Sequence, residues 1–200
     1  ADHPMRAEVL ASQPTDWRAV VAQLTGPVPG GRRVFYQKHM THHMLPAIGR
    51  DWTANVRNAF LIRAPEDVLL SYTQVRGAAT LEDIGVPQQM ELFERACDRL
   101  GHAPPVIDSH DVLEDPRGVL AVLCDALGIA FSDAMLSWPA GRRDSDGVWA
   151  PAWYGAVERS TEFARPRARA RFEDLPDDLK VVAEAARPAY DRLAAYRLQA

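Results

Sequence analysis

The feature that most constrains the fold is a pair of helix-start and helix-end signals that recurs three times along the middle of the chain. Each time a Pro begins a segment with helical apolar spacing and a Gly ends it, over residues 65–77, 87–101 and 116–128. Pro suits the first turn of a helix because its missing N–H would have no partner there, and Gly readily adopts the left-handed conformation that ends a helix. The sequence therefore predicts three capped helices.

Short apolar runs alternate with these helices, at residues 34–36, 59–62 and 105–107. Such runs are typical of strands buried on both faces of a parallel sheet. The alternation predicts an α/β fold of three layers, a mostly parallel sheet flanked by helices. Thr15 and Asp16 can cap an earlier helix, and a final helix follows Leu175, which we expect to kink or break near Pro188.

Size and charge limit the kind of protein. Two hundred residues, of which 47% are hydrophobic, suffice for a single domain over residues 1–200. The formal net charge of −4 argues against a nucleic-acid or anionic membrane surface, and no apolar run reaches the roughly 20 residues that span a bilayer. We expect a soluble cytoplasmic protein. Cys97 and Cys124 lack the spacing of a zinc site, so we expect reduced thiols and no metal centre.

Polar residues at strand ends carry the chemical information, because ligands of open parallel sheets bind beyond the carboxyl ends of the strands. The strand at 59–62 delivers Arg63 to that edge, and Ser71 follows two turns into the next helix. A guanidinium fork and a hydroxyl could together hold one phosphate. Alternatively, Arg63 pairs with a neighbouring carboxylate and Ser71 only packs.

The segment from Phe60 to Tyr72 closely resembles sulfotransferases, in which a strand ends in Arg-(Asn or Asp)-Pro and the next helix carries Ser-Tyr. The resemblance implies that Arg63 and Ser71 bind the 3′-phosphate of 3′-phosphoadenosine 5′-phosphosulfate (PAPS). Ala64 stands where Asn or Asp is usual, and the lost N-cap should cost the helix about 1 kcal/mol. Residues 106–129 resemble the family's later strand, its acidic turn and the following helix, and they support the fold.

Lys38 and His39, with His42 and His43 before Leu45-Pro46, are similar to the sulfotransferase segment Lys-Thr-His-Leu-Pro. The resemblance implies that a histidine takes the proton of the acceptor hydroxyl, a task that suits an unperturbed pKa of about 6.5. The register is off by a few residues, so the choice of histidine is open. His39 ranks first because it directly follows the expected strand and its Lys, and His42, which is nearer to Leu45-Pro46, ranks second. The histidines could instead be a surface cluster that binds divalent metal adventitiously.

A late segment, Arg142-Arg143 with Asp146-Gly147-Val148-Trp149, resembles the sulfotransferase loop that closes over the nucleotide. The resemblance implies that Arg142, Arg143 and Trp149 contact the 3′-phosphate and adenine of PAPS. Either arginine could instead pair with Asp144 or Asp146.

The glycine-rich stretch 26–33 contains two prolines and no following Gly-Lys-Ser/Thr, so it cannot act as the family's phosphosulfate-binding loop. We expect a chain truncated at its N-terminus relative to the family, without the first strand, and therefore poorly stable or homo-oligomeric and inactive by itself. The function that the resemblance implies is sulfuryl transfer from PAPS to a hydroxyl or amine of a small-molecule acceptor. The alternatives are a nucleotide-dependent phosphotransferase, with Asp108 as a Mg²⁺ ligand, and a non-catalytic domain that binds a nucleotide or a partner.

Overall fold

The computed structural model describes residues 5–200, without the side chains of Val75 and Arg76. The described chain forms two compact units. One comprises residues 5–36 and 132–164, and the other comprises residues 37–131 and 165–200. The single domain expected from the sequence stays a prediction. No helix among the described residues has both the length and the apolar character needed to cross a bilayer.

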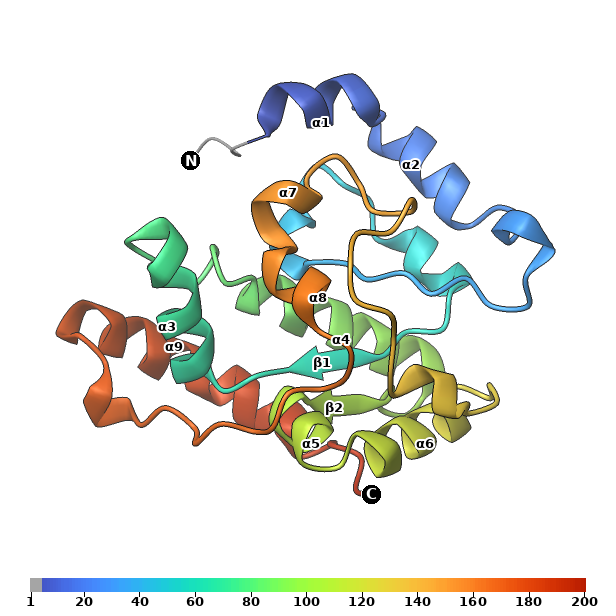
Figure 1. Ribbon diagram of the computed structural model, residues 1–200. Helices are drawn as coiled ribbons and strands as arrows, with labels where there is room; N and C mark the ends of the chain where they lie inside the picture. The colour runs from blue at the N-terminus through green and yellow to red at the C-terminus, as the bar shows by residue number, and fades with distance from the viewer. Residues whose placement is uncertain (1–4) are drawn as a thin grey trace. The chain divides into compact units, whose positions relative to one another are not determined.

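The unit of residues 37–131 and 165–200 is built around two parallel strands, β1 (Phe60–Ile62) and β2 (Val106–Asp108), which lie side by side in Figure 1. Phe60 pairs with Val106, and Ile62 pairs with Asp108. The C-terminal segment adds a bridge to β2, where the Leu198 N–H donates to the Val106 carbonyl at 2.9 Å. The fold is therefore α/β with a small parallel sheet and mostly helices.

The helices of this unit include the three that the Pro and Gly signals predicted. The helices are α3 (Pro65–Arg76), α4 (Val86–Leu100), α5 (Ser109–Glu114), α6 (Pro116–Ala126) and α9 (Asp177–Ala194). Short 3₁₀ turns occupy Thr41–His43, Asp51–Asn55 and Phe172–Asp174. Gly77, Gly101 and Gly128 all have the positive φ that the sequence pattern requires at a helix end. The three helices predicted in the middle of the chain are confirmed.

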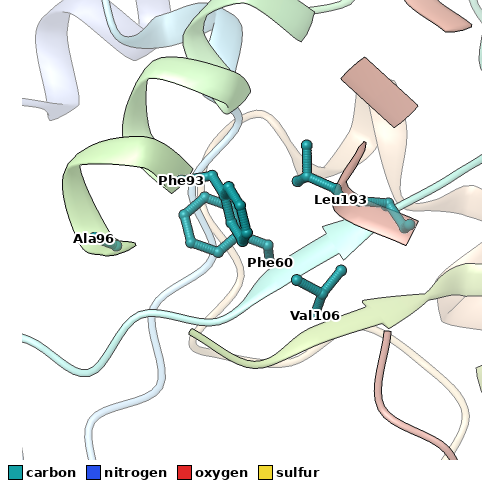
Figure 2. Packing of buried hydrophobic residues seen from close by; sticks show 6 residues of the cluster. Phe60, Phe93, Ala96, Val106 and Leu193 are labelled. Atoms are coloured by element: carbon teal, nitrogen blue, oxygen red, sulfur yellow. The ribbon is translucent and has the colours of Figure 1, made fainter. Parts of the chain in front are cut away.

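Two hydrophobic clusters hold these elements together. The first joins β1, β2, α4 and α9, and its buried residues are Phe60, Ile62, Phe93, Ala96, Val106 and Leu193, most of them visible in Figure 2. The second packs α3 against α9 and the turn before it, through Leu69, Leu175, Leu179 and Ala183. Because α9 contributes to both clusters, its packing on either side of Pro188 is secured.

The strand expected at residues 34–36 and the helix break expected near Pro188 are both absent from the described residues. Residues 34–36 form no strand, and Tyr36 is 81% exposed. Their apolar run has no neighbouring strand to accept its backbone hydrogen bonds, and it ends where one unit gives way to the other. The final helix does not break at Pro188, because α9 continues to Ala194. The two clusters outweigh the one backbone hydrogen bond that proline removes.

The other unit contains α1 (Arg6–Ser12), α2 (Trp17–Leu24), α7 (Ala150–Trp153) and α8 (Gly155–Arg159), with 3₁₀ turns at Pro29–Gly31 and Asp133–Met135. Asp16 caps α2 as expected, since its carboxylate accepts the Arg18 N–H at 3.0 Å. Ser137 and Glu162 form an antiparallel bridge that closes the segment carrying α7 and α8.

Candidate functional site

Arg63 lies directly beyond the carboxyl end of β1, between the buried residues Ile62 and Ala64. Its own side chain is exposed, as is that of Ser71 on α3. Six residues at 1.5 Å per residue place Ser71 roughly 9 Å along the α3 axis from Pro65. Among the described residues, neither the Arg63 guanidinium nor the Ser71 hydroxyl has a hydrogen-bond or ion-pair partner. Both groups are therefore available to an anion.

The acidic residues nearest to Arg63 along the chain are engaged elsewhere. Glu66, which is 3% exposed, is paired with Arg187 of α9. Asp67 accepts the backbone N–H of Ala170 at 3.0 Å. The structure thus offers no support for the alternative in which Arg63 serves a neighbouring carboxylate. Ala64 makes no side-chain cap at the start of α3, as its methyl group requires.

Lys38 and His39 lie in an extended segment at the surface of the same unit. The His39 ring lies 5.4 Å from the Trp52 ring, centroid to centroid, and its Nε2 is 3.2 Å from the Gln37 side-chain oxygen. Partial burial lowers the pKa of His39 from its ordinary value of 6.5, because desolvation disfavours the charged imidazolium. His39 is therefore mostly neutral at pH 7, the form that a general base requires.

His42 lies in the 3₁₀ turn Thr41–His43, which is fixed against the start of α4. The Thr41 hydroxyl donates to the Gly85 carbonyl at 2.9 Å. A Cβ on Gly85 would lie 2.6 Å from the His42 backbone nitrogen, and its φ of 73° also favours glycine. The His42 and His43 rings meet edge to face at 4.3 Å. The turn is thus held at a defined place, whereas His39 stands in an extended segment.

Arg50 organises the segment that follows these histidines, a role that the sequence analysis missed. It is 8% exposed and donates to the carbonyls of Met44, Leu45 and Ile48. Its Nε and Nη2 also bind the two carboxylate oxygens of Glu91 on α4, both at 3.1 Å. All five guanidinium N–H groups are used, so Arg50 is structural. A cavity of about 520 Å³ lies between residues 44–50 and α4.

Asp108 at the carboxyl end of β2 is fully buried, and both of its carboxylate oxygens accept hydrogen bonds. It caps α5 by accepting the His110 N–H at 2.8 Å, and it accepts the Tyr190 hydroxyl at 2.6 Å. The Arg169 guanidinium lies 3.3 Å from the same carboxylate and donates to the Tyr190 oxygen at 3.0 Å. Burial and the Asp108 carboxylate raise the pKa of Tyr190, which keeps it a donor. Asp108 thus stabilises the sheet edge, and its oxygens are not open to a metal ion.

Arg142, Arg143 and Trp149 belong to the unit of residues 5–36 and 132–164. Both guanidinium groups are exposed, and Asp146 accepts the backbone N–H of Arg143 at 2.9 Å, which shapes the loop. The Trp149 ring covers Gly147 so closely that a Cβ there would lie 2.3 Å from it. Its Nε1 donates to the Tyr154 hydroxyl at 3.5 Å. The glycine is therefore needed for this Gly-x-Trp arrangement, and the loop's nucleotide role stays a prediction.

Comparison with known proteins decides the family. A family model described as a sulfotransferase domain matches residues 1–196. The chain belongs to the sulfotransferase-domain family. It is 34% identical over 166 residues to "Branched-chain-amino-acid aminotransferase-like protein 1" of Arabidopsis thaliana, and 30% identical to the plant's protein 2 of the same name. These matches cover 83% of this chain and 29% of each relative. The chain thus spans under a third of their length. No solved structure matches it.

The sulfotransferase-domain chain brings five of the eight predicted site residues into one unit: Lys38, His39, His42, Arg63 and Ser71. Arg142, Arg143 and Trp149 lie in the other unit. Their roles stay predictions. The cavity beside Arg50 was not predicted, because its walls come from segments about forty residues apart in the sequence.

The pKa of His39 gives a direct test of its surroundings in this sulfotransferase-domain protein. We expect His39 to titrate below 6.5 in NMR spectra of the folded chain, and Trp52→Ala to raise its pKa toward 6.5 by restoring hydration. Because the unfolded chain binds this proton at higher pH than the folded chain, His39 lowers stability as the pH falls through 6.5 toward the folded pKa. A His39 signal that titrates at or above 6.5 would contradict the assignment.

Proposed function

We propose that this protein transfers a sulfuryl group from PAPS to a hydroxyl or amine of a small molecule. The observation that carries the proposal is that Arg63, beyond β1, and Ser71, on the helix that follows, are both exposed and unpartnered among the described residues, while the acidic residues nearest in sequence bind elsewhere. An arginine fork with a hydroxyl suits a phosphate monoester, and in the family these positions hold the 3′-phosphate of the donor. Arg142, Arg143 and Trp149 would add to nucleotide binding.

In the proposed reaction the acceptor oxygen forms a bond to sulfur while the bond from sulfur to the leaving phosphate oxygen breaks. The acceptor's proton passes to a histidine, and adenosine 3′,5′-bisphosphate leaves. His39 and His42 are the bases that we propose, with Lys38 beside them. Catalysis would come from positioning the two substrates in line and from positive charge near the leaving group.

The three-layer fold with a P-loop type of sheet is also a proposal, supported by the parallel strands β1 and β2 and by family membership. A homo-oligomeric state and a cytoplasmic location stay predictions from the sequence.

The phosphotransferase alternative is weaker, because Asp108, its one proposed Mg²⁺ ligand, is enclosed by Tyr190, Arg169 and the His110 N–H. A non-catalytic nucleotide-binding domain would share the donor site but would never turn over. An assay with PAPS and a hydroxyl acceptor separates it from the sulfotransferase, since only the latter would transfer a sulfuryl group and release adenosine 3′,5′-bisphosphate.

The binding test uses thermal unfolding with three nucleotides. Adenosine 3′,5′-bisphosphate should raise the melting temperature, whereas adenosine 5′-monophosphate and Mg²⁺-ATP should raise it much less, because they lack the 3′-phosphate. Arg63→Ala should weaken bisphosphate binding roughly 10- to 150-fold, since a hydrogen bond to a charged group contributes about 1.5–3 kcal/mol. Ser71→Ala should weaken it less.

Arg99→Ala is the matched control, because Arg99 is also an exposed arginine of the same unit and, within the part of the chain that the structure describes, donates only to the Thr53 carbonyl. It should bind the bisphosphate as the wild type does. Equal responses to the bisphosphate and the monophosphate, or an Arg63→Ala chain that binds normally, would overturn the proposed function.

A further inference from the structure

Two acidic residues in the first turn of α3 lie close to Arg63 along the chain. Glu66 and Asp67 follow it by three and four residues, so the Cα atoms of Arg63 and Glu66 are at most about 11 Å apart. Both of these residues have long side chains, which can meet across that distance. A free carboxylate here would pair with the Arg63 guanidinium or repel an approaching anion. The fate of these carboxylates therefore decides whether Arg63 is available.

The Glu66 carboxylate is bound by a cation from a distant helix. The Nη2 of Arg187 on α9, 121 residues further along the chain, donates to it. The Glu66 side chain is only 4% exposed, so water cannot neutralise its charge and a protein partner has to. α3 and α9 lie side by side in Figure 1 and share a hydrophobic cluster, which keeps the two residues together.

The Asp67 carboxylate is engaged in another way. It accepts the backbone N–H of Ala170 at 3.0 Å, from the segment that precedes α9. This amide fixes the direction of the Asp67 side chain but brings no full charge. The positive charge that neutralises the first turn of α3 thus comes from Arg187.

Arg187 is held in place by more than Glu66. Its guanidinium lies 5.3 Å from the centre of the Tyr190 ring, and its Nη1 lies 3.9 Å from the Asp191 carboxylate. Both of these partners belong to α9 itself. The charge of Glu66 can therefore be removed without leaving Arg187 unpartnered.

We propose that Arg187 is a positioning residue for the donor site. By binding the Glu66 carboxylate it keeps the Arg63 guanidinium free for an anion. That the anion is the 3′-phosphate of the donor rests on the proposed function. The competition between Glu66 and an anion for Arg63 rests only on the contacts of α3 and α9.

The test titrates adenosine 3′,5′-bisphosphate into the chain and its variants by calorimetry, at a temperature at which circular dichroism shows each to be folded. Arg187→Ala should weaken binding at least tenfold, because an uncompensated charge at roughly 10 Å acts through an effective dielectric constant of about 20. Adding Glu66→Gln to that variant should restore binding to within about twofold of the wild type, since the competing carboxylate is gone. If the ion pair only held α3 in place, the double variant would bind no better than Arg187→Ala.

Arg192→Ala is the matched control, because Arg192 is also an arginine of α9 and pairs with Glu94 of α4 at 3.1 Å. It should bind the bisphosphate as the wild type does. Arg187→Gln replaces Arg187→Ala if that variant fails to fold, since it keeps a donor for the Glu66 carboxylate but no charge. A folded Arg187 variant that binds as tightly as the wild type, or a double variant as weak as the single one, would overturn the inference.

The Nε–H signal of Arg63 in NMR spectra gives a readout without nucleotide. Its proton should exchange rapidly with water in the wild type and more slowly in Arg187→Ala, where Glu66 pairs with it. An unchanged exchange rate in a folded Arg187→Ala chain refutes the inference, even if Arg63→Ala abolishes bisphosphate binding and so supports the proposed function. Slowed exchange in a protein that does not bind the bisphosphate refutes the donor site and leaves the role of Arg187 in place.

Discussion

Phe93→Ala lowers the free energy of unfolding by about 3–5 kcal/mol, the largest loss we expect from any single substitution in this chain. Phe93 is 1% exposed and is the centre of the cluster in Figure 2. Its ring meets Phe60 edge to face at 5.4 Å and lies 5.4 Å from the Tyr196 ring. Alanine removes these contacts and leaves a cavity between α4 and β1 that rigid neighbours fill only in part.

Urea unfolding followed by circular dichroism measures this loss. Phe93→Leu is the control, and it should cost much less because it keeps most of the buried apolar volume. A loss of about 4 kcal/mol is a large part of the 5–15 kcal/mol typical of domains, so the alanine variant should unfold at a clearly lower urea concentration than the wild type. An alanine variant that unfolds at the wild-type urea concentration would show that α4 does not pack on β1 as described.

Asp108→Ala is expected to lower the free energy of unfolding by about 3 kcal/mol. The carboxylate caps α5, which contributes about 1 kcal/mol, and it receives charge-assisted hydrogen bonds from Tyr190 and Arg169. Its removal leaves the Tyr190 hydroxyl and the Arg169 guanidinium without this acceptor, although Arg169 is 33% exposed and recovers some hydration.

Tyr190→Phe is the matched control for Asp108→Ala. It removes one donor and keeps the carboxylate, so it should cost about 1–2 kcal/mol. The same variants decide the role of Asp108 in metal binding. If Asp108 held Mg²⁺ for a phosphotransferase, its removal would abolish stabilisation by Mg²⁺-ATP and cost little stability without nucleotide. We expect Asp108→Ala to lower stability without nucleotide and to leave the response to Mg²⁺-ATP unchanged.

Local sequence signals were sufficient for the three capped helices in the middle of the chain and for the position of Arg63 at the end of β1. Pro65 and Gly77 bound α3 on their own, because each acts on the backbone of one or two residues. Arg63 could be placed at a strand end from the short apolar run before it. The same local signal failed at residues 34–36, since a strand needs a neighbouring strand, and that neighbour is not a property of the run itself.

What the sequence determined by itself is therefore the three capped helices, the strands β1 and β2, family membership, and the position of Arg63 beyond β1. Only the tertiary structure decided the roles of Asp108 and Arg50, because their partners Tyr190 and Glu91 lie 82 and 41 residues away. It also created the cavity beside Arg50. Capping and strand burial depend on neighbouring residues, whereas pairing of buried charges and the shape of a cavity depend on which distant segments the folded chain brings together.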